Sequence, residues 1–136
     1  MVIDASVWVA AFLPYEPNHK AAQRCIAELS TSSEPTELPT LALVETCGAI
    51  ARRTNSADAA QQIRQFLVSQ HWISFFAVDS GLVSVASDIA INHKLRGADA
   101  IYVALAKMRS QPLISLDAEI IQRSKSIVEC QVLGRD

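Results

Sequence analysis

Four acidic side chains stand in stretches of sequence that are otherwise apolar or neutral. They are Asp4 in MVIDASVW, Glu45 in LALVETCGAI, Asp99 in RGADAIYVALA and Asp117 in PLISLDAEI. An ionised carboxylate is costly to bury unless it is paired or binds a metal. Only Asp99 has a Lys or Arg within three residues, which is Arg96. If the fold gathers these acids, they need bound protons or a divalent cation, and oxygen ligands suit Mg²⁺ or Mn²⁺.

The expected positions of the four acids favour one shared site. Asp4 and Asp117 each follow or end a short apolar strand, and parallel sheets bind ligands outside the carboxyl ends of their strands. Asp99 begins an expected helix and Glu45 lies about one turn into another, so both can reach the same edge. Taken singly, Asp99 and Asp117 are explained equally well by helix capping or by compensation of the helix dipole. Glu45 has apolar or small helical neighbours, which fit a solvated surface poorly.

Two serines are candidates to act together with these acids in the site. Ser6 follows Asp4 by two residues, where its hydroxyl could bind a metal-bound water or a phosphate oxygen. The simpler interpretation is that Ser6 caps a helix beginning at Val7, and the two roles are compatible. Ser115 stands at the same spacing before Asp117 and is the weaker candidate.

Two arginines are candidate ligands of substrate phosphates. Arg52 follows Glu45 by seven residues, two helical turns along the same face, and Arg96 precedes Asp99 by three. An ordinary exposed arginine, or one that offsets the acidic charge, explains each equally well. No Ser–His or Cys–His pairing is apparent, and none of the histidines is expected to be catalytic (His19, His71 and His93).

The elements that position these residues belong to an α/β domain. At 136 residues, half of them hydrophobic, the chain is expected to form a single domain over residues 1–136. We expect strands at residues 1–3, 37–39, 72–78, 113–116 and 128–133, separated by helices with caps at Asn18, Ser56 and Asp79 or Ser80. Short apolar strands that alternate with helices indicate a mainly parallel sheet.

Bulk composition narrows the class of protein further. The net charge of −2, from 12 basic and 14 acidic residues, gives no global sign of a nucleic-acid binder, although an acidic metal site would itself lower the charge. The three cysteines form no CxxC pair, which fits a reducing compartment. No apolar run approaches the roughly 20 residues of a membrane span, and no secretory signal is visible. We therefore expect a soluble cytoplasmic protein that does not enter a membrane.

The phrases that carry the acids resemble, in order, the motifs of PIN-domain nucleases. Asp-Ala-Ser after the first strand, Glu within LVETCGAIARR, RGADAIYVALA and SLDAEI span essentially the whole chain. The closest resemblance is to the small VapC-type toxins of type II toxin–antitoxin pairs. It implies a three-layer sandwich with a mainly parallel central sheet flanked by helices. It also implies a homodimer, RNA as substrate and a cognate antitoxin that covers the site.

The same resemblance implies roles for individual residues. Asp4, Glu45, Asp99 and Asp117 would bind one or two Mg²⁺ or Mn²⁺ ions, and Ser6 would assist. The predicted function is a metal-dependent endoribonuclease and toxin, and the alternatives are a PIN nuclease in RNA processing or a catalytically silent binding scaffold. A metal-dependent adhesion module would need a serine where Trp8 stands, and a haloacid-dehalogenase-like phosphatase would need a second aspartate in place of Ser6.

Overall fold

A computed structural model describes residues 1–133, and within them five strands form one parallel sheet accompanied by seven helices. The strands are β1 (Val2–Ile3), β2 (Thr36–Pro39), β3 (Ile73–Phe76), β4 (Leu113–Ser115) and β5 (Cys130–Val132). The helices are α1 (Ala5–Phe12), α2 (His19–Thr31), α3 (Leu41–Thr54), α4 (Ala57–Ser69), α5 (Ser80–His93), α6 (Gly97–Arg109) and α7 (Ala118–Ser124). The expected α/β class with a parallel sheet is confirmed.

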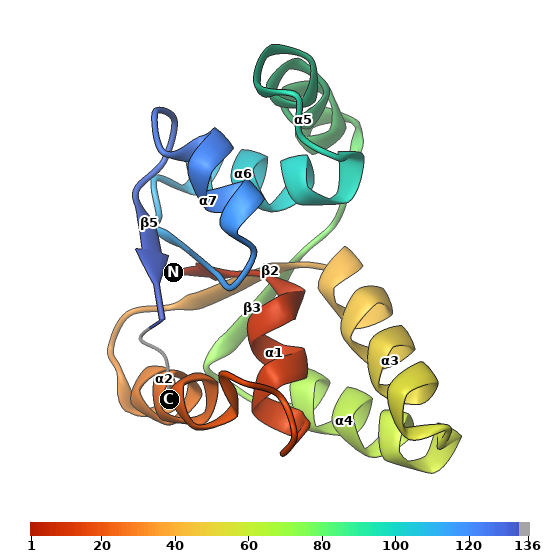
Figure 1. Cartoon of the computed structure of the whole chain (residues 1–136). Helices are drawn as coiled ribbons and strands as arrows, with labels where there is room; N and C mark the ends of the chain where they lie inside the picture. The colour runs from red at the N-terminus through yellow and green to blue at the C-terminus, as the bar shows by residue number, and fades with distance from the viewer. Residues whose placement is uncertain (134–136) are drawn as a thin grey trace.

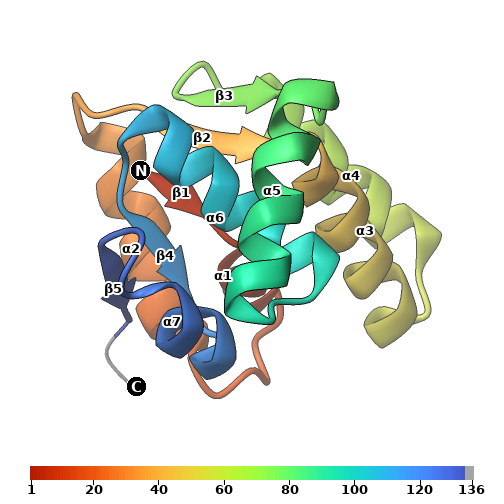
Figure 2. The same cartoon turned by 90° about the horizontal axis from the view of Figure 1, so that it is seen from above.

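Helices cover both faces of the sheet. Figure 1 shows α1 to α4 on one side of the strands and α5 to α7 on the other, and Figure 2 shows α6 lying across the middle of the sheet. The core that joins these layers is apolar and tightly closed, with Ile3, Trp8 and Val103 fully buried. Helix α6 is buried nearly all round because apolar residues occupy every face of its middle turns, as the sequence predicts.

The strand order is β3-β2-β1-β4-β5. The chain first adds β2 and β3 on one side of β1, and then crosses over to add β4 and β5 on the other side. The reversal falls between β1 and β4, where Val2 pairs with Leu113 and Ile3 with Ile114. The Asp4 N–H continues this ladder by donating to the Ile114 carbonyl at 2.9 Å. In open parallel sheets, the crevice at such a reversal is the usual ligand site. Asp4 and the end of β4 therefore meet where a ligand is expected.

Four predicted strands are shorter than expected: those at residues 1–3 and 113–116 each lose one residue, and two others lose three. The strand predicted at residues 72–78 is confined to Ile73–Phe76, because its only neighbour, β2, offers four residues for pairing. The strand predicted at 128–133 is confined to Cys130–Val132, which pairs with the three residues of β4. Strand length in a sheet is set by the partner as much as by the local sequence.

Four of the predicted helix caps can be compared with the structure. Ser56 accepts a hydrogen bond from the Ala59 N–H, and Asp79 accepts one from the Leu82 N–H. Asn18 stands at the N-cap of α2 but makes no side-chain capping bond. The predicted cap at Ser6 is wrong: α1 begins at Ala5, so that Asp4 takes the N-cap position and Ser6 lies in the first turn.

Both tryptophans contribute to the core. Trp8 is fully buried, and its ring stacks on that of Trp72 with the centroids 6.1 Å apart. All three cysteines are free (Cys25, Cys47 and Cys130). Among the described residues, no helix combines the length and the apolar character that crossing a bilayer would require.

Candidate active site

Asp4 is the most enclosed of the four predicted acids. It leaves the end of β1 and is only 5% exposed. Its Oδ2 accepts hydrogen bonds from the hydroxyls of Ser6 at 2.5 Å and Ser115 at 2.8 Å. Burial raises the pKa of Asp4, and these hydroxyl donors oppose the rise because they favour the ionised form. The carboxylate is thus held in one orientation by neutral donors.

The two serines tie the ends of the two central strands together. The Ser6 hydroxyl also accepts from the Leu116 N–H at 3.1 Å, and the Ser115 hydroxyl accepts from the Asp117 N–H at 3.0 Å. Ser115 is fully buried. Each serine therefore uses its hydroxyl once as a donor to Asp4 and once as an acceptor from the segment that follows β4. This double use explains why Ser6 does not cap a helix.

Glu45 extends toward the same edge from α3. Its Oε1 accepts a hydrogen bond of 2.7 Å from the hydroxyl of Tyr102, a fully buried residue of α6. Burial raises the pKa of Glu45, and the charges of Asp4 and Asp99 raise it further. Burial, followed by the neighbouring Glu45 charge, also raises the pKa of Tyr102, which keeps its hydroxyl protonated and able to donate.

Tyr102 is a site residue that was not predicted from the sequence. One signal could have found it: Tyr102 follows Asp99 by three residues, so it shares a helical face with that acid, and it carries the only hydroxyl in IYVALA. Its partner is 57 positions away in the chain, however, and no local pattern identifies that distant contact.

Arg96 joins the remaining two acids. Its Nε donates to Asp99 Oδ2 at 2.8 Å and its Nη2 to Asp117 Oδ2 at 2.9 Å. The other oxygen of Asp117 caps α7 by accepting from the Glu119 and Ile120 N–H groups. The capping interpretation is therefore confirmed for Asp117. Asp99 lies in the first turn of α6, and Arg96 itself occupies the N-cap position there.

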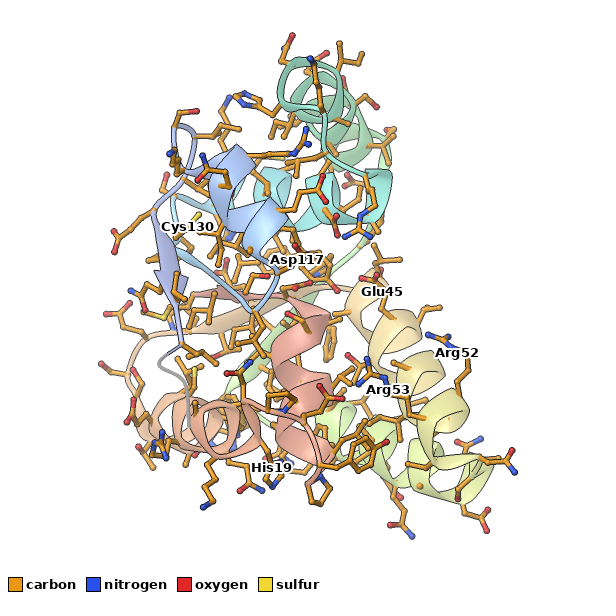
Figure 3. The ribbon with its side chains drawn as sticks, in the orientation of Figure 1. His19, Glu45, Arg52, Arg53, Asp117 and Cys130 are labelled. Carbon is orange, nitrogen blue, oxygen red and sulfur yellow. The ribbon has the colours of Figure 1, made fainter. Side chains whose placement is uncertain are left out.

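The four carboxylates share one electrostatic environment. Burial raises the pKa of Asp99, Arg96 lowers it, and the charges of Asp4 and Asp117 raise it again. In the view of Figure 3, Asp117 and Glu45 both lie at the level where the upper and lower helical layers meet. Within residues 1–133, no three Asp, Glu, His or Cys side chains converge closely enough to hold an ion in their present conformations. Oxygen donors of this kind nevertheless fit Mg²⁺ or Mn²⁺ chemically, because both ions prefer carboxylate ligands.

A groove runs from this cluster between α1 and α3. Its volume is about 660 Å³, and its lining includes Ser6, Glu45, Leu116, Arg52 and Arg53. We call it the α1–α3 groove. Arg53 is ion-paired with Glu16, whereas Arg52 forms no ion pair with any residue in the range 1–133.

The Arg52 side chain turns back along its own helix. A Cβ atom added to Gly48 would lie 3.4 Å from Nη1 of Arg52, so the guanidinium rests against α3 one turn nearer to Glu45. This direction is the usual one for long side chains on helices. The unpaired arginine and the carboxylate cluster therefore border the same groove.

Other titratable side chains lie apart from the site. His19 is at the opposite end of α1 in Figure 3, where its Nδ1 lies 2.8 Å from the Ala10 carbonyl. Glu37 is a buried acid that the sequence analysis passed over, and it is neutralised by two hydrogen bonds from Arg109, at 3.0 and 2.9 Å. The contrast is informative, since Asp4 and Glu45 have hydroxyl donors where Glu37 has a guanidinium.

Comparison with known proteins identifies the family. The PIN domain family model matches residues 1–125, so the chain belongs to the PIN-domain family. No curated protein sequence gives a significant match.

Solved structures with the same fold include a toxin and a toxin–antitoxin complex. VapC20 of Mycobacterium tuberculosis, described as a sarcin-ricin loop cleaving toxin, superposes with a TM-score of 0.79 at 19% identity, covering 99% of this chain and 98% of that one. VapBC2 of Rickettsia felis, bound to a promoter DNA fragment, superposes with a TM-score of 0.74 at 9% identity, with 98% of each chain covered. FitAcB of Neisseria gonorrhoeae superposes with a TM-score of 0.68 at 17% identity, covering 95% of this chain and 94% of that one. At these identities the likeness establishes a shared fold.

Proposed function

We propose that this protein is a divalent-metal-dependent endoribonuclease and the toxin of a toxin–antitoxin pair. The observation that carries the proposal is the gathering of Asp4, Glu45, Asp99 and Asp117 at the reversal of strand order in a PIN domain. Arg96 is the one basic side chain in the range 1–133 that forms ion pairs with any of the four. Carboxylates that are partly buried together cost stability unless protons, cations or a bound metal compensate their charge.

The proposed chemistry is hydrolysis of an RNA phosphodiester bond. The four carboxylates would hold one or two Mg²⁺ or Mn²⁺ ions, which when bound supply activation of water and neutralisation of charge on the leaving oxygen. Ser6 and Ser115 fix the orientation of Asp4, and Tyr102 fixes that of Glu45. Because Ser115 is fully buried, we assign it this positioning role in place of the substrate contact that the sequence suggested.

We assign substrate binding to the α1–α3 groove. Arg52 borders the groove without an ionic partner, which leaves its guanidinium available for a phosphate of the RNA strand. Arg96 lies at the cluster itself, where a second phosphate contact is possible once it is free of its acids. Phosphate contacts of this kind position a strand and carry no sequence preference.

The proposed partners are a cognate antitoxin and a second copy of the same chain, in the cytoplasm. A structure of the same fold from Klebsiella pneumoniae is described as a toxin–antitoxin complex, which supports an antitoxin partner. Large apolar side chains stand exposed beside the site and along α5, among them Val44 and Ile91. The homodimer is tested by measuring molar mass in solution with light scattering.

Cleavage of total cellular RNA by the purified protein tests the proposed activity. The reactions contain Mg²⁺, Mn²⁺ or EDTA, and they compare the wild type with Asp99→Asn. Asp88→Asn is the matched control, because Asp88 is an exposed acid of α5 outside the cluster. We expect discrete fragments with wild type and control that disappear with EDTA or with Asp99→Asn. Cleavage that survives both treatments would refute the mechanism, and a protein inactive with either metal after any inhibitor is removed would favour the scaffold alternative.

A further inference from the structure

Arg96 occupies an unusual place for an arginine. It stands at the N-cap of α6, and its guanidinium spans from Asp99 in that helix to Asp117 at the start of α7, 21 residues away in the sequence. The arginine side chain is 67% exposed, whereas the side chains of Asp99 and Asp117 are 13% and 30% exposed. The positive group therefore covers two partly buried carboxylates from the solvent side.

We propose that Arg96 is a built-in competitor of the divalent cation, an inference that rests on the metal-dependent function proposed above. In the metal-free protein it neutralises Asp99 and Asp117 and holds their Oδ2 atoms in hydrogen bonds. An ion bound by these carboxylates needs lone pairs on the same oxygens and repels a guanidinium at close range. Metal binding therefore requires Arg96 to leave at least one of its two partners.

Several features allow the side chain to withdraw. Within residues 1–133, the Arg96 side chain forms hydrogen bonds only with the competing acids, and most of its surface already faces solvent. The segments it bridges have their own support: the Asp117 Oδ1 caps α7 independently of the arginine. Departure of the guanidinium thus removes charge compensation without removing a helix cap. Once released, it remains beside the place where a substrate phosphate would be bound.

The chain offers a matched control at Arg123. This residue pairs with Glu119 at 3.1 Å on α7 and donates to the Lys94 carbonyl, so it is a nearby arginine that touches none of the four acids. Removing its charge changes the general field around the cluster, whereas removing Arg96 also frees the two carboxylates. A difference between the two substitutions isolates the direct competition.

The test is a titration of the metal-stripped full chain with Mn²⁺, followed by electron paramagnetic resonance of the free ion. We expect Arg96→Gln to bind Mn²⁺ about tenfold more tightly than wild type, and Arg123→Gln to bind within about twofold of wild type. Arg96→Lys retains the charge but loses the two-armed geometry, and we expect an intermediate affinity. Urea unfolding in EDTA supplies a second readout, in which Arg96→Gln is less stable than wild type and regains that difference when Mn²⁺ is added.

The outcomes separate this inference from the proposed function. If wild type binds Mn²⁺ and Arg96→Gln binds with equal or weaker affinity, the competition is refuted while the metal-dependent function stands. If neither wild type nor any variant binds Mn²⁺, both proposals fall. Circular dichroism verifies the fold of each variant, and Arg96→Lys decides the question if Arg96→Gln does not fold.

Discussion

Asp4 shows how a single residue couples stability to chemistry. Its carboxylate is almost fully enclosed and receives hydrogen bonds from two serine hydroxyls, with no arginine or lysine to neutralise it. Burial raises its pKa, which means that the ionised form is disfavoured in the folded protein relative to the unfolded chain. The residue that the proposed reaction needs in its charged form is therefore destabilising at neutral pH when no cation is bound.

The first prediction is that Asp4→Asn stabilises the metal-free protein. The asparagine Oδ1 can accept the same two hydroxyl bonds while the buried charge is removed, and we expect a gain of about 1–2 kcal/mol in the free energy of unfolding at pH 7. Urea denaturation in EDTA measures it. The control is Asp88→Asn on the exposed face of α5, which is expected to shift stability by less than about 0.5 kcal/mol. A destabilised Asp4→Asn would show that the ionised form is favoured by its hydroxyl donors.

The second prediction concerns the pH dependence of that gain. A carboxyl group with a raised folded-state pKa binds its proton more tightly in the native state, so its contribution to stability is largest at low pH and is lost as pH rises through the folded pKa. The advantage of Asp4→Asn should therefore shrink on acidification and vanish below about pH 4, near the ordinary pKa of Asp. Unfolding of both proteins in EDTA at several pH values between 4 and 7 measures the trend. An advantage that is constant with pH would exclude Asp4 ionisation as its cause.

The third prediction is that Tyr102→Phe impairs the site while leaving the fold intact. The substitution removes the hydroxyl that donates to Glu45 and creates almost no cavity, so the cost is that of one hydrogen bond to a charged group, about 1.5–3 kcal/mol. We also expect weaker Mn²⁺ binding, by about threefold to tenfold, because Glu45 loses its fixed orientation. Tyr15→Phe is the control, since Tyr15 is 63% exposed and its hydroxyl makes only a 3.5 Å contact with a backbone carbonyl. Equal effects of the two substitutions would remove Tyr102 from the site.

A site residue could be predicted from the sequence when its signal was local, and could not when its role depends on a contact made by the fold. The four acids could be predicted because an acidic residue in an apolar segment is energetically unfavourable, and this can be recognised from the sequence alone. Ser6 reaches Asp4 from two residues away, but its bond with the Leu116 N–H joins segments 110 residues apart. The role of Ser115 as a donor to Asp4 likewise depends on how β1 and β4 pair, across 111 residues of sequence. The bridging by Arg96 has the same origin, because the contact with Asp117 joins two helix starts that only the fold brings together.

At the scale of elements, the sequence predicts whether a segment is a helix or a strand, and the order of these elements along the chain. It predicts less well the residues at which each element begins and ends. Helices such as α6 and α2 carry a strong apolar pattern, and they occur where predicted. The strands are two to four residues long, too short for their own periodicity to define their ends. The order of the strands within the sheet, β3-β2-β1-β4-β5, could not be predicted from the sequence, because it depends on which strands pair across long connections.

The fourth prediction distinguishes a true helix cap from a residue that only occupies the capping position. Ser56 accepts a hydrogen bond of 3.1 Å from the Ala59 N–H, so Ser56→Ala should cost about 1 kcal/mol in unfolding free energy. Asn18 makes no such bond, and Asn18→Ala should cost less than half as much. Urea denaturation of the two variants under identical conditions makes the comparison. Equal losses would show that the capping bond at Ser56 contributes little.

At the scale of the whole molecule, the charge balance limits how RNA can be held. The net charge is −2, and ion pairs within residues 1–133 join Arg53, Arg96, Arg109 and Arg123 to acids. Such a balance provides no net positive charge to attract a polyanion at long range. Under the proposed function, RNA affinity would rest on a few phosphate contacts in the α1–α3 groove and on contacts near the acidic cluster.

The fifth prediction is a weak salt dependence of RNA binding. Each phosphate neutralised on single-stranded RNA contributes about −0.7 to the slope of log K against log salt, so two or three contacts give a slope of about −1.4 to −2.1. Fluorescence anisotropy of a labelled oligoribonucleotide with the non-cleaving Asp99→Asn protein measures the slope. Arg52→Gln should make it shallower by about 0.7, whereas Arg64→Gln on the exposed side of α4 should leave it unchanged. A slope steeper than about −4 would require an extended basic surface, which this chain could supply only by contributing residues from a second copy or a partner.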